Sequence, residues 1–234
     1  MNTLQAIRES EKQSHTEMYS NSNLFQEGSW LRRPIKTVLN LIPLFEEYKE
    51  LSVLDLGCGV GRNCIAIAER YKTIPCRIDC VDILEIAIEK LIENATSYGV
   101  ASAINGVVST IEAFEVVKNR YDLVMAVSAL EHTENKQVFI DKLIEIRDGI
   151  KDNGIVCLVI NSQISERNKE TGDNLFPQFE VNLQTDEMLS ILKTVFCGWE
   201  EIKLTTSVQQ YDIPRGKIIS NLKSNVITLV ARKR

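Results

Sequence analysis

The sequence predicts an α/β fold with a doubly wound, mostly parallel sheet, and three observations support this prediction. From residue 51 onward, short apolar runs alternate with longer segments of helical periodicity, a pattern typical of parallel strands joined by crossover helices. A glycine-rich turn follows the first apolar run. The chain has 234 residues, of which 44% are hydrophobic, so it can bury one sizeable core. We therefore expect a single globular unit.

The expected strands are the short apolar runs, and the expected helices occupy the intervals between them. Strands are predicted at residues 51–56, 76–81, 103–108, 121–127 and 154–160. Helices are predicted at residues 62–71, 84–97 and 135–151, the last ending at the turn Asp152-Asn153-Gly154. A further helix near residues 186–196 is followed by a hairpin pair of strands at 199–206 and 225–231.

The first fifty residues differ from this pattern and are predicted to form a helical cap (residues 1–50) over a domain of residues 51–234. An early polar helix is followed by a loop at residues 21–29 and by a second helix that Pro34 opens and that runs to about Lys49. Trp30 and Arg33 flank the start of that helix. They could cover the ligand or hold its carboxylate, and a buried tryptophan and a solvated arginine are equally consistent with the sequence.

The turn after the first strand carries the most informative motif, Asp55-Leu56-Gly57-Cys58-Gly59-Val60-Gly61-Arg62. Glycine at alternate positions lets backbone amides approach a ligand, as in nucleotide-binding loops. The dinucleotide fingerprint requires its third glycine where this chain has Arg62. Asp55 would repel a pyrophosphate, but it would attract an ammonium or a sulfonium. The ligand is therefore expected to combine positive charge with an adenosine, as S-adenosylmethionine does.

This motif resembles the first motif of the class I S-adenosylmethionine-dependent methyltransferases, which has the form acidic-x-Gly-x-Gly-x-Gly. The resemblance extends from about residue 51 to the final residues. It implies a Rossmann-like sheet of seven strands, the last of them antiparallel. It also implies S-adenosylmethionine as the cofactor, S-adenosylhomocysteine as the product and methyl transfer to a small-molecule acceptor as the reaction.

In an open parallel sheet the ligand binds beyond the carboxyl ends of the strands, so the strand ends supply the expected cofactor contacts. Asp82, about twenty residues past the glycine loop, is expected to accept from both ribose hydroxyls, and a helix N-cap is its alternative role. Ile83 is expected to pack on the adenine. The complete expected set is Asp55, Gly57, Cys58, Gly59, Gly61, Arg62, Asp82, Ile83, Ser109, Thr110, Ile111, Val127, Ser128, Trp30 and Arg33.

The adenine contact departs from the family pattern. Family members often carry an aspartate after the third strand that accepts from the adenine amino group, whereas this chain reads Val108-Ser109-Thr110-Ile111. Ser109 or a backbone carbonyl would have to substitute.

Methyl transfer from a sulfonium is an in-line displacement with a neutral leaving group, so positioning supplies most of the rate. A general base is needed only if the acceptor must lose a proton. Glu131 and His132 follow the fourth strand, where the methyl group is expected to emerge. His132 is the preferred candidate base, because the pKa of a free imidazole lies near physiological pH. A loop histidine without chemical function is the alternative.

The C-terminal part resembles the tellurite-resistance (TehB-like) methyltransferases at Phe176-Pro177-Gln178-Phe179, at Gly198-Trp199-Glu200 and at residues 228–233. Those enzymes methylate small oxyanions or chalcogen-type nucleophiles and carry histidine and arginine between the last two strands. Here the segment 209–217 has no histidine. Arg215 and Lys217 could meet an anion, or they are hairpin-loop charges. Tellurite or chalcogen-oxyanion methylation is therefore an alternative function.

Charge and hydropathy indicate which classes of binding partner to expect. A net charge of -5 gives no field that would gather nucleic acid or anionic lipid, and no segment is long and apolar enough to span a bilayer. We expect a cytoplasmic monomer or homodimer that acts on a small molecule. The six cysteines lack metal-ligand spacing, which predicts buried free thiols and no metal. Two other functions stay open, a nicotinamide-dependent oxidoreductase and a non-catalytic S-adenosylmethionine-binding protein.

Overall fold

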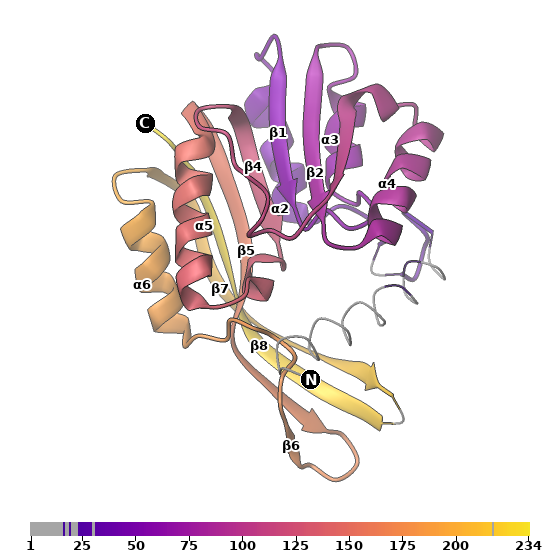
Figure 1. Cartoon of the computed structure of the whole chain (residues 1–234), viewed down its shortest axis with the longest axis vertical. Helices are drawn as coiled ribbons and strands as arrows, with labels where there is room; N and C mark the ends of the chain where they lie inside the picture. The colour runs from indigo at the N-terminus through magenta and orange to yellow at the C-terminus, as the bar shows by residue number, and fades with distance from the viewer. Residues whose placement is uncertain (1–15, 17–18, 20–22, 30, 217) are drawn as a thin grey trace.

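The computed structural model describes residues 16, 19, 23–29, 31–216 and 218–234 (Figure 1). Its described strands form one mixed sheet in the order β3-β2-β1-β4-β5-β8-β7, with the short strand β6 paired to β5. Strands β1 to β5 pair in parallel, whereas β8 is antiparallel to both β5 and β7. The predicted α/β class with an antiparallel last strand is confirmed, and β6 is an addition to the seven expected strands.

The strands are β1 (Leu51–Leu56), β2 (Cys76–Asp82), β3 (Ile104–Val108), β4 (Tyr121–Val127), β5 (Ile150–Asn168), β6 (Asn174–Leu175), β7 (Glu200–Arg215) and β8 (Ile218–Arg232). The α-helices are α2 (Lys36–Leu41), α3 (Cys64–Arg70), α4 (Glu85–Ser97), α5 (Lys136–Gly149) and α6 (Thr185–Val195). Three 3-10 turns are η1 (Ile42–Phe45), η2 (Ala101–Ala103) and η3 (Leu130–His132).

Helices cover both faces of the sheet, which is why the central strands are apolar on both sides. One hydrophobic cluster joins Val53 of β1 to side chains of α2, α3 and α4, and the other joins Leu54 to side chains of α5 and α6 (Figure 1). Successive residues of β1 thus pack on opposite faces, as the pleat requires. Val53 and Leu54 are both completely buried.

The helix predicted from Pro34 to Lys49 is much shorter in the structure. Only α2 is α-helical, and the chain continues as the 3-10 turn η1. Pro43 in η1 has no N–H to donate to the preceding turn, so the α-helical bonding pattern cannot continue through it. The early polar helix lies mostly outside the described residues. Among those that are described, Tyr19 joins the cluster that also contains α2.

The helix predicted to end at Lys151 instead ends at Gly149, and β5 begins at the next residue. The expected turn at residues 152–154 is an irregularity within β5, where Asn153 adopts a φ of +65°. The pairing of β5 with β4 shifts register at this point. The last residue of α5 is a glycine at a position with no room for a side chain, because a Cβ on Gly149 would lie 2.5 Å from the side chain of Val116.

The C-terminal strands are longer than predicted and form a projecting arm, defined by residues 161–168, 174–175, 207–215 and 218–226 (Figure 1). The predicted strands 154–160, 199–206 and 225–231 are therefore only the inner parts of β5, β7 and β8. The expected loop at 209–217 is strand as far as Arg215, and Lys217 lies outside the described residues. A bulge between Ser162 and Ser165, with Gln163 at a φ of +48°, marks where β5 enters the arm.

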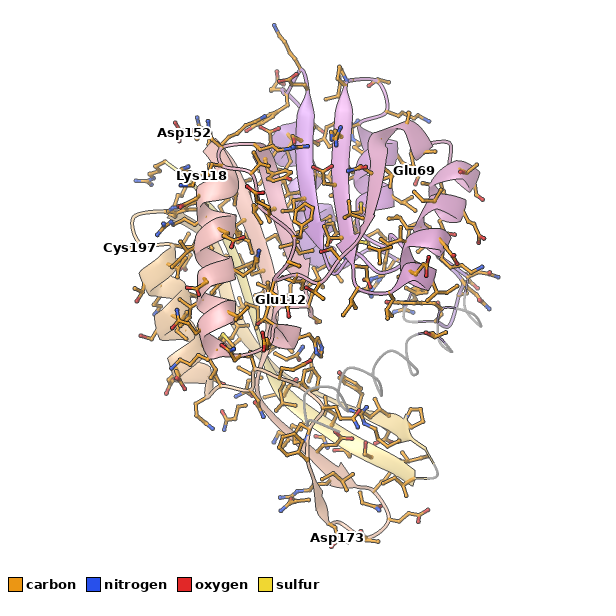
Figure 2. All side chains as sticks on the ribbon, viewed as in Figure 1. Glu69, Glu112, Lys118, Asp152, Asp173 and Cys197 are labelled. Atoms are coloured by element: carbon orange, nitrogen blue, oxygen red, sulfur yellow. The ribbon has the colours of Figure 1, made fainter. Side chains whose placement is uncertain are left out.

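Figure 2 helps to orient the two ends of the sheet. Asp152 and Lys118 lie at the edge where the parallel strands begin, Glu112 lies at the carboxyl edge, and Asp173 lies at the tip of the arm. The arm thus projects from the edge where ligands bind in sheets of this kind. No described helix is long and apolar enough to cross a membrane.

Candidate functional site at the carboxyl edge of the sheet

The glycine loop connects β1 to α3 at the carboxyl edge of the sheet. Gly57, Gly59 and Gly61 adopt φ values of +73°, +53° and +94°, a region that favours glycine. The amide of Gly57 donates to the carbonyl of Val81 at 2.8 Å, which holds the loop against the end of β2. A Cβ on Gly57 would lie 2.3 Å from the Cβ of Ala129. Backbone conformation and close packing therefore both require glycine here.

Asp55 is the most unusual carboxylate of this edge. It is 1% exposed, and its Oδ2 accepts no hydrogen bond from any described residue. Burial and the nearby Asp82 raise the pKa of Asp55 to about 7, although Arg62 opposes the shift. A buried carboxylate oxygen without a donor costs free energy, and a ligand cation placed beside it would offset that cost. The residues of the loop therefore fit an ammonium or a sulfonium group.

Asp82 ends β2 and holds two parts of the site together. Its Oδ2 accepts from the amide of Gly59 at 2.9 Å, and its Oδ1 accepts from the amide of Leu84 at 3.0 Å. The side chain thus holds both the glycine loop and the start of α4. Each carboxylate oxygen can accept more than one hydrogen bond, so these contacts are compatible with ribose binding. The adjacent Ile83 is 48% exposed and offers an apolar surface beside that carboxylate.

The other expected contacts lie along the same edge. The amide of Ser109 donates to the carbonyl of Asp82, which places Ser109, Thr110 and Ile111 beside the end of β2. The hydroxyl of Ser109 donates to the carbonyl of Thr110. Val127 is half-buried at the end of β4, and Ser128 is exposed with a φ of +50°. The structure therefore brings the predicted strand-end residues together, and their contacts with a cofactor stay predictions.

The expected N-terminal contacts of Trp30 and Arg33 with the cofactor stay predictions. Arg33 is exposed, and Trp30 lies outside the described residues. Tyr19, which was not predicted, lies over the glycine loop, because its hydroxyl oxygen is 2.9 Å from the position that a Cβ on Gly59 would take. Tyr19 is 5% exposed, and burial together with Asp82 raises its pKa. A single tyrosine in a polar segment gives no sequence signal for this position.

A second group of polar residues surrounds η3, next to the end of β4. Glu131 is completely buried, and its Oε1 accepts from the backbone amide of Asn161 at 3.2 Å and from the side-chain amide of the same residue. Its Oε2 has no hydrogen-bond partner among the described residues. Burial raises the pKa of Glu131, while His132 and Asn161 oppose the shift. The hydroxyl of Ser224 donates to Asn161 at 2.8 Å and so orients the amide.

His132 is held from two sides. Its Nδ1 lies 3.0 Å from the Oε2 of Glu180, whose side chain is 2% exposed. Its ring stacks on Phe179 with a centroid distance of 4.9 Å and an interplanar angle of 25°. These contacts fix the imidazole close to the end of β4, where the sequence predicts that the methyl group emerges.

Arg215 is already paired. Its guanidinium donates to both carboxylate oxygens of Glu166, at 2.9 and 3.3 Å, and to Gln178 at 2.6 Å. Glu166 is almost fully buried, so its charge requires this partner. The contact of Arg215 with an anionic acceptor stays a prediction. To make this contact, the guanidinium would have to bind the acceptor and Glu166 at the same time.

Residues 53–154 match a family model described as a methyltransferase domain. These residues therefore carry the sequence pattern of a methyltransferase domain and are called the methyltransferase domain below. The match agrees with the predicted resemblance to S-adenosylmethionine-dependent methyltransferases over this part of the chain.

Curated relatives share part of the methyltransferase domain. Over 115 residues the chain is 34% identical to a ubiquinone biosynthesis O-methyltransferase of Rickettsia canadensis, a match that covers 49% of this chain and 44% of that protein. Over 106 residues it is 28% identical to norajmaline N-methyltransferase of Rauvolfia serpentina, covering 42% and 32% respectively. The chain therefore spans less than half the length of these two relatives.

The crystal structure of TehB from Haemophilus influenzae is similar in fold, with a TM-score of 0.60 and 18% sequence identity. The match covers 83% of this chain and 62% of that chain. At this identity the likeness concerns the fold alone.

Four cysteine thiols pack in the hydrophobic cluster that also contains Val60 of the glycine loop. The prediction of buried free thiols is confirmed for Cys58, Cys64, Cys80 and Cys157, whereas it is wrong for Cys76, which is half-buried, and for Cys197, which is exposed. Burial raises the pKa of Cys58 to about 12, so its thiol stays protonated and weakly nucleophilic near neutral pH. We infer that these thiols serve packing.

The affinity of the methyltransferase domain for S-adenosylmethionine is expected to depend on pH below 7. Because the pKa of Asp55 in the protein without ligand is about 7, a growing fraction of this carboxyl carries a proton as the pH falls. That proton must leave before the carboxylate can pair with a cation. The dissociation constant should rise by up to about tenfold per pH unit below 7. Calorimetric titrations between about pH 5.5 and 7 measure this slope, and an unchanged constant would contradict the role of Asp55.

Proposed function

We propose that the chain is an S-adenosylmethionine-dependent methyltransferase that acts on a small-molecule acceptor and releases S-adenosylhomocysteine. The observation that carries this proposal is the buried Oδ2 of Asp55, which lacks a donor among the described residues and lies beside a glycine loop. The domain match and the relatives named as O- and N-methyltransferases support it. A cytoplasmic location and a monomeric or homodimeric state stay predictions.

Different residues would contact different parts of the cofactor. Asp55 would bind the ammonium, Asp82 the ribose hydroxyls and Ile83 the adenine face. The open backbone of Gly57 and Gly59 would allow close approach. S-adenosylmethionine, when bound, supplies an electrophilic methyl group attached to a sulfonium. The protein then has to align the acceptor with that methyl group, which can contribute about 7 to 11 kcal/mol to lowering the barrier.

His132 is the residue proposed to handle a proton. Glu180 orients the imidazole through its Nδ1 and would stabilise the protonated ring, much as a carboxylate orients a catalytic histidine in other enzymes. An acceptor with an O–H or N–H group could therefore transfer its proton to His132 as the methyl group arrives. Glu131 lies next to this histidine in the chain.

Oxyanion methylation has no specific observation in its favour. Arg215, the arginine expected to meet an anion, is paired with Glu166. A non-catalytic binding protein would share every feature of the cofactor site, so only an experiment can separate it from an enzyme.

The test has two stages. Calorimetry with S-adenosylmethionine and with S-adenosylhomocysteine is expected to give dissociation constants in the micromolar range. This corresponds to a binding free energy of about -8 kcal/mol. The protein is then incubated with methyl-labelled cofactor and a fractionated metabolite extract, and the labelled product is identified by its mass. Failure to bind either compound would end the proposal. Binding without transfer to any fraction would favour the non-catalytic protein.

A further inference from the structure

Glu131 has a buried polar atom for which the fold itself supplies no donor. The side chain is completely buried, and its Oε2 has no hydrogen-bond partner among the described residues. The opposite oxygen is held by Asn161, which in turn accepts from Ser224, and both of these residues are buried. Leaving a buried carboxylate oxygen unpaired typically costs about 1 to 3 kcal/mol or more. A network of three buried polar residues that positions one unpaired oxygen indicates a ligand contact.

The charges around Glu131 indicate the sign of that ligand. His132 of η3 faces Glu180, which lies in the segment after β6. On the arm, Arg215 faces Glu166, with which it forms a two-pronged ion pair. Each of these two basic side chains therefore already lies beside a carboxylate.

Glu131 is left as the third carboxylate of the group, without an ion pair among the described residues. Among the described residues, this group thus has one more carboxyl than it has basic side chains. A hydrogen-bond donor that carries positive charge would complete it.

Partly exposed side chains border the buried oxygen. Tyr211 of β7 is 45% exposed; partial burial raises the Tyr211 pKa, and the charge of Glu131 adds to this shift. His132, next to Glu131 in the chain, has a side chain that is 24% exposed.

We propose that Glu131 binds a protonated amine of the methyl acceptor, so that the acceptor is a small molecule carrying an amino group and not an oxyanion. This inference rests on the proposed methyltransferase function and adds the chemical class of the acceptor to it. The amine is the recognition group. The methylated atom is whichever nucleophile of the same molecule lies next to the cofactor.

The acceptor class can be tested before the acceptor is identified. A metabolite extract is separated by ion exchange at neutral pH into cationic, neutral and anionic fractions, and each is incubated with the full chain and methyl-labelled S-adenosylmethionine. Selenite and tellurite are assayed in parallel. Label is expected in a product that carries an amino group. Label only in products without an amino group, or transfer to either oxyanion, would overturn the amine assignment while leaving the methyltransferase function intact.

Absence of cofactor binding would instead remove the proposed function itself. Binding of the cofactor without transfer to any fraction would count against both the enzyme and its acceptor class. The three failures are therefore distinguishable.

The Glu131→Gln variant tests the residue. It keeps the size of the side chain and an oxygen for Asn161, and it removes the charge that would attract an amine. With the active cationic fraction or the amine purified from it, KM is expected to rise at least about thirtyfold. The dissociation constant of S-adenosylmethionine should change by less than about twofold, because Asp55 and the glycine loop are untouched. Glu187→Gln on α6 is the matched control, since this glutamate is 41% exposed and pairs with Lys136.

A purely structural role of Glu131 makes a different prediction. In that case the variant would lose kcat, cofactor affinity and thermal stability together. An unchanged KM in a folded Glu131→Gln variant would overturn the proposed contact.

Discussion

Replacing Asp55 by asparagine is expected to weaken S-adenosylmethionine binding about a hundredfold and, at the same time, to stabilise the protein without ligand. Removing one partner of a buried charged pair typically costs 2 to 5 kcal/mol of binding free energy, and about 2.7 kcal/mol corresponds to a hundredfold change. Asparagine keeps the shape of the side chain, so the loss would come from the charge. Calorimetry at about pH 7.5, above the carboxyl pKa, measures the effect.

The stabilising part of this prediction follows from the pKa of Asp55. In the folded chain the pKa is about 7, whereas the ordinary value is 3.8. The folded state therefore binds a proton more tightly than the unfolded state does. The stability contributed by this group is fully present below the unfolded pKa and is lost as the pH rises through the folded pKa. Above pH 7 the wild type holds a buried charge that asparagine lacks, so the variant should unfold at a higher temperature.

Asp122→Asn is the matched control for Asp55→Asn. Asp122 is also buried in the central sheet, but its carboxylate accepts from the amide of Ser52 and from Lys151. Its neutralisation would break an ion pair, so this variant should be destabilised and should bind the cofactor normally. If Asp55→Asn were destabilised like the control and kept its affinity, the electrostatic account of the glycine loop would be wrong.

Replacing Gly57 by alanine is expected to cost about 3 kcal/mol of unfolding free energy, or roughly 6 to 12 °C in the melting temperature. The residue has a φ of +73°, which costs an alanine about 1 kcal/mol. Its Cβ would also lie 2.3 Å from the Cβ of Ala129, a methyl group fixed to the backbone that cannot turn away. The segment that carries Glu131 and His132 would have to move.

Gly99→Ala separates these two costs. Gly99 has nearly the same φ, +69°, but no atom lies within 4 Å of the position that its Cβ would take. This variant should lose only the conformational part, about 1 kcal/mol. Thermal unfolding of both proteins, followed by circular dichroism, provides the comparison. Equal losses in the two variants would mean that the contact between the glycine loop and Ala129 does not limit stability.

Much of the fold could be predicted because the central strands are continuous apolar runs. The predicted strands at 51–56 and 121–127 agree with β1 and β4 at both ends. These strands are buried on both faces, so their boundaries coincide with the change from apolar to polar sequence. The arm could not be predicted in this way. Residues such as Asn161 and Ser162 are polar, and they are strand because β8 pairs with them.

The candidate site could likewise be predicted from the sequence only in part. The glycine loop and Asp82 are local signals, since each follows a predicted strand at a spacing set by the turn it forms. The carboxylate that contacts His132 belongs to Glu180, 48 positions further along the chain, and the carboxylate that pairs with Arg215 belongs to Glu166, 49 positions before it. No local pattern specifies such distant pairs. Their identity depends on how far β5 and β7 extend beyond the sheet.

The bulge at which β5 enters the arm also separates the residues proposed to bind the cofactor from those that surround the proposed acceptor site. The proposed cofactor contacts all precede residue 130, whereas the partners of Glu131, His132 and Arg215 all follow residue 160. Substitutions in the last third of the chain could therefore alter which molecule is accepted without disturbing the cofactor. Grafting another arm at this bulge is a direct route to enzymes with new acceptors, and it offers evolution the same opportunity.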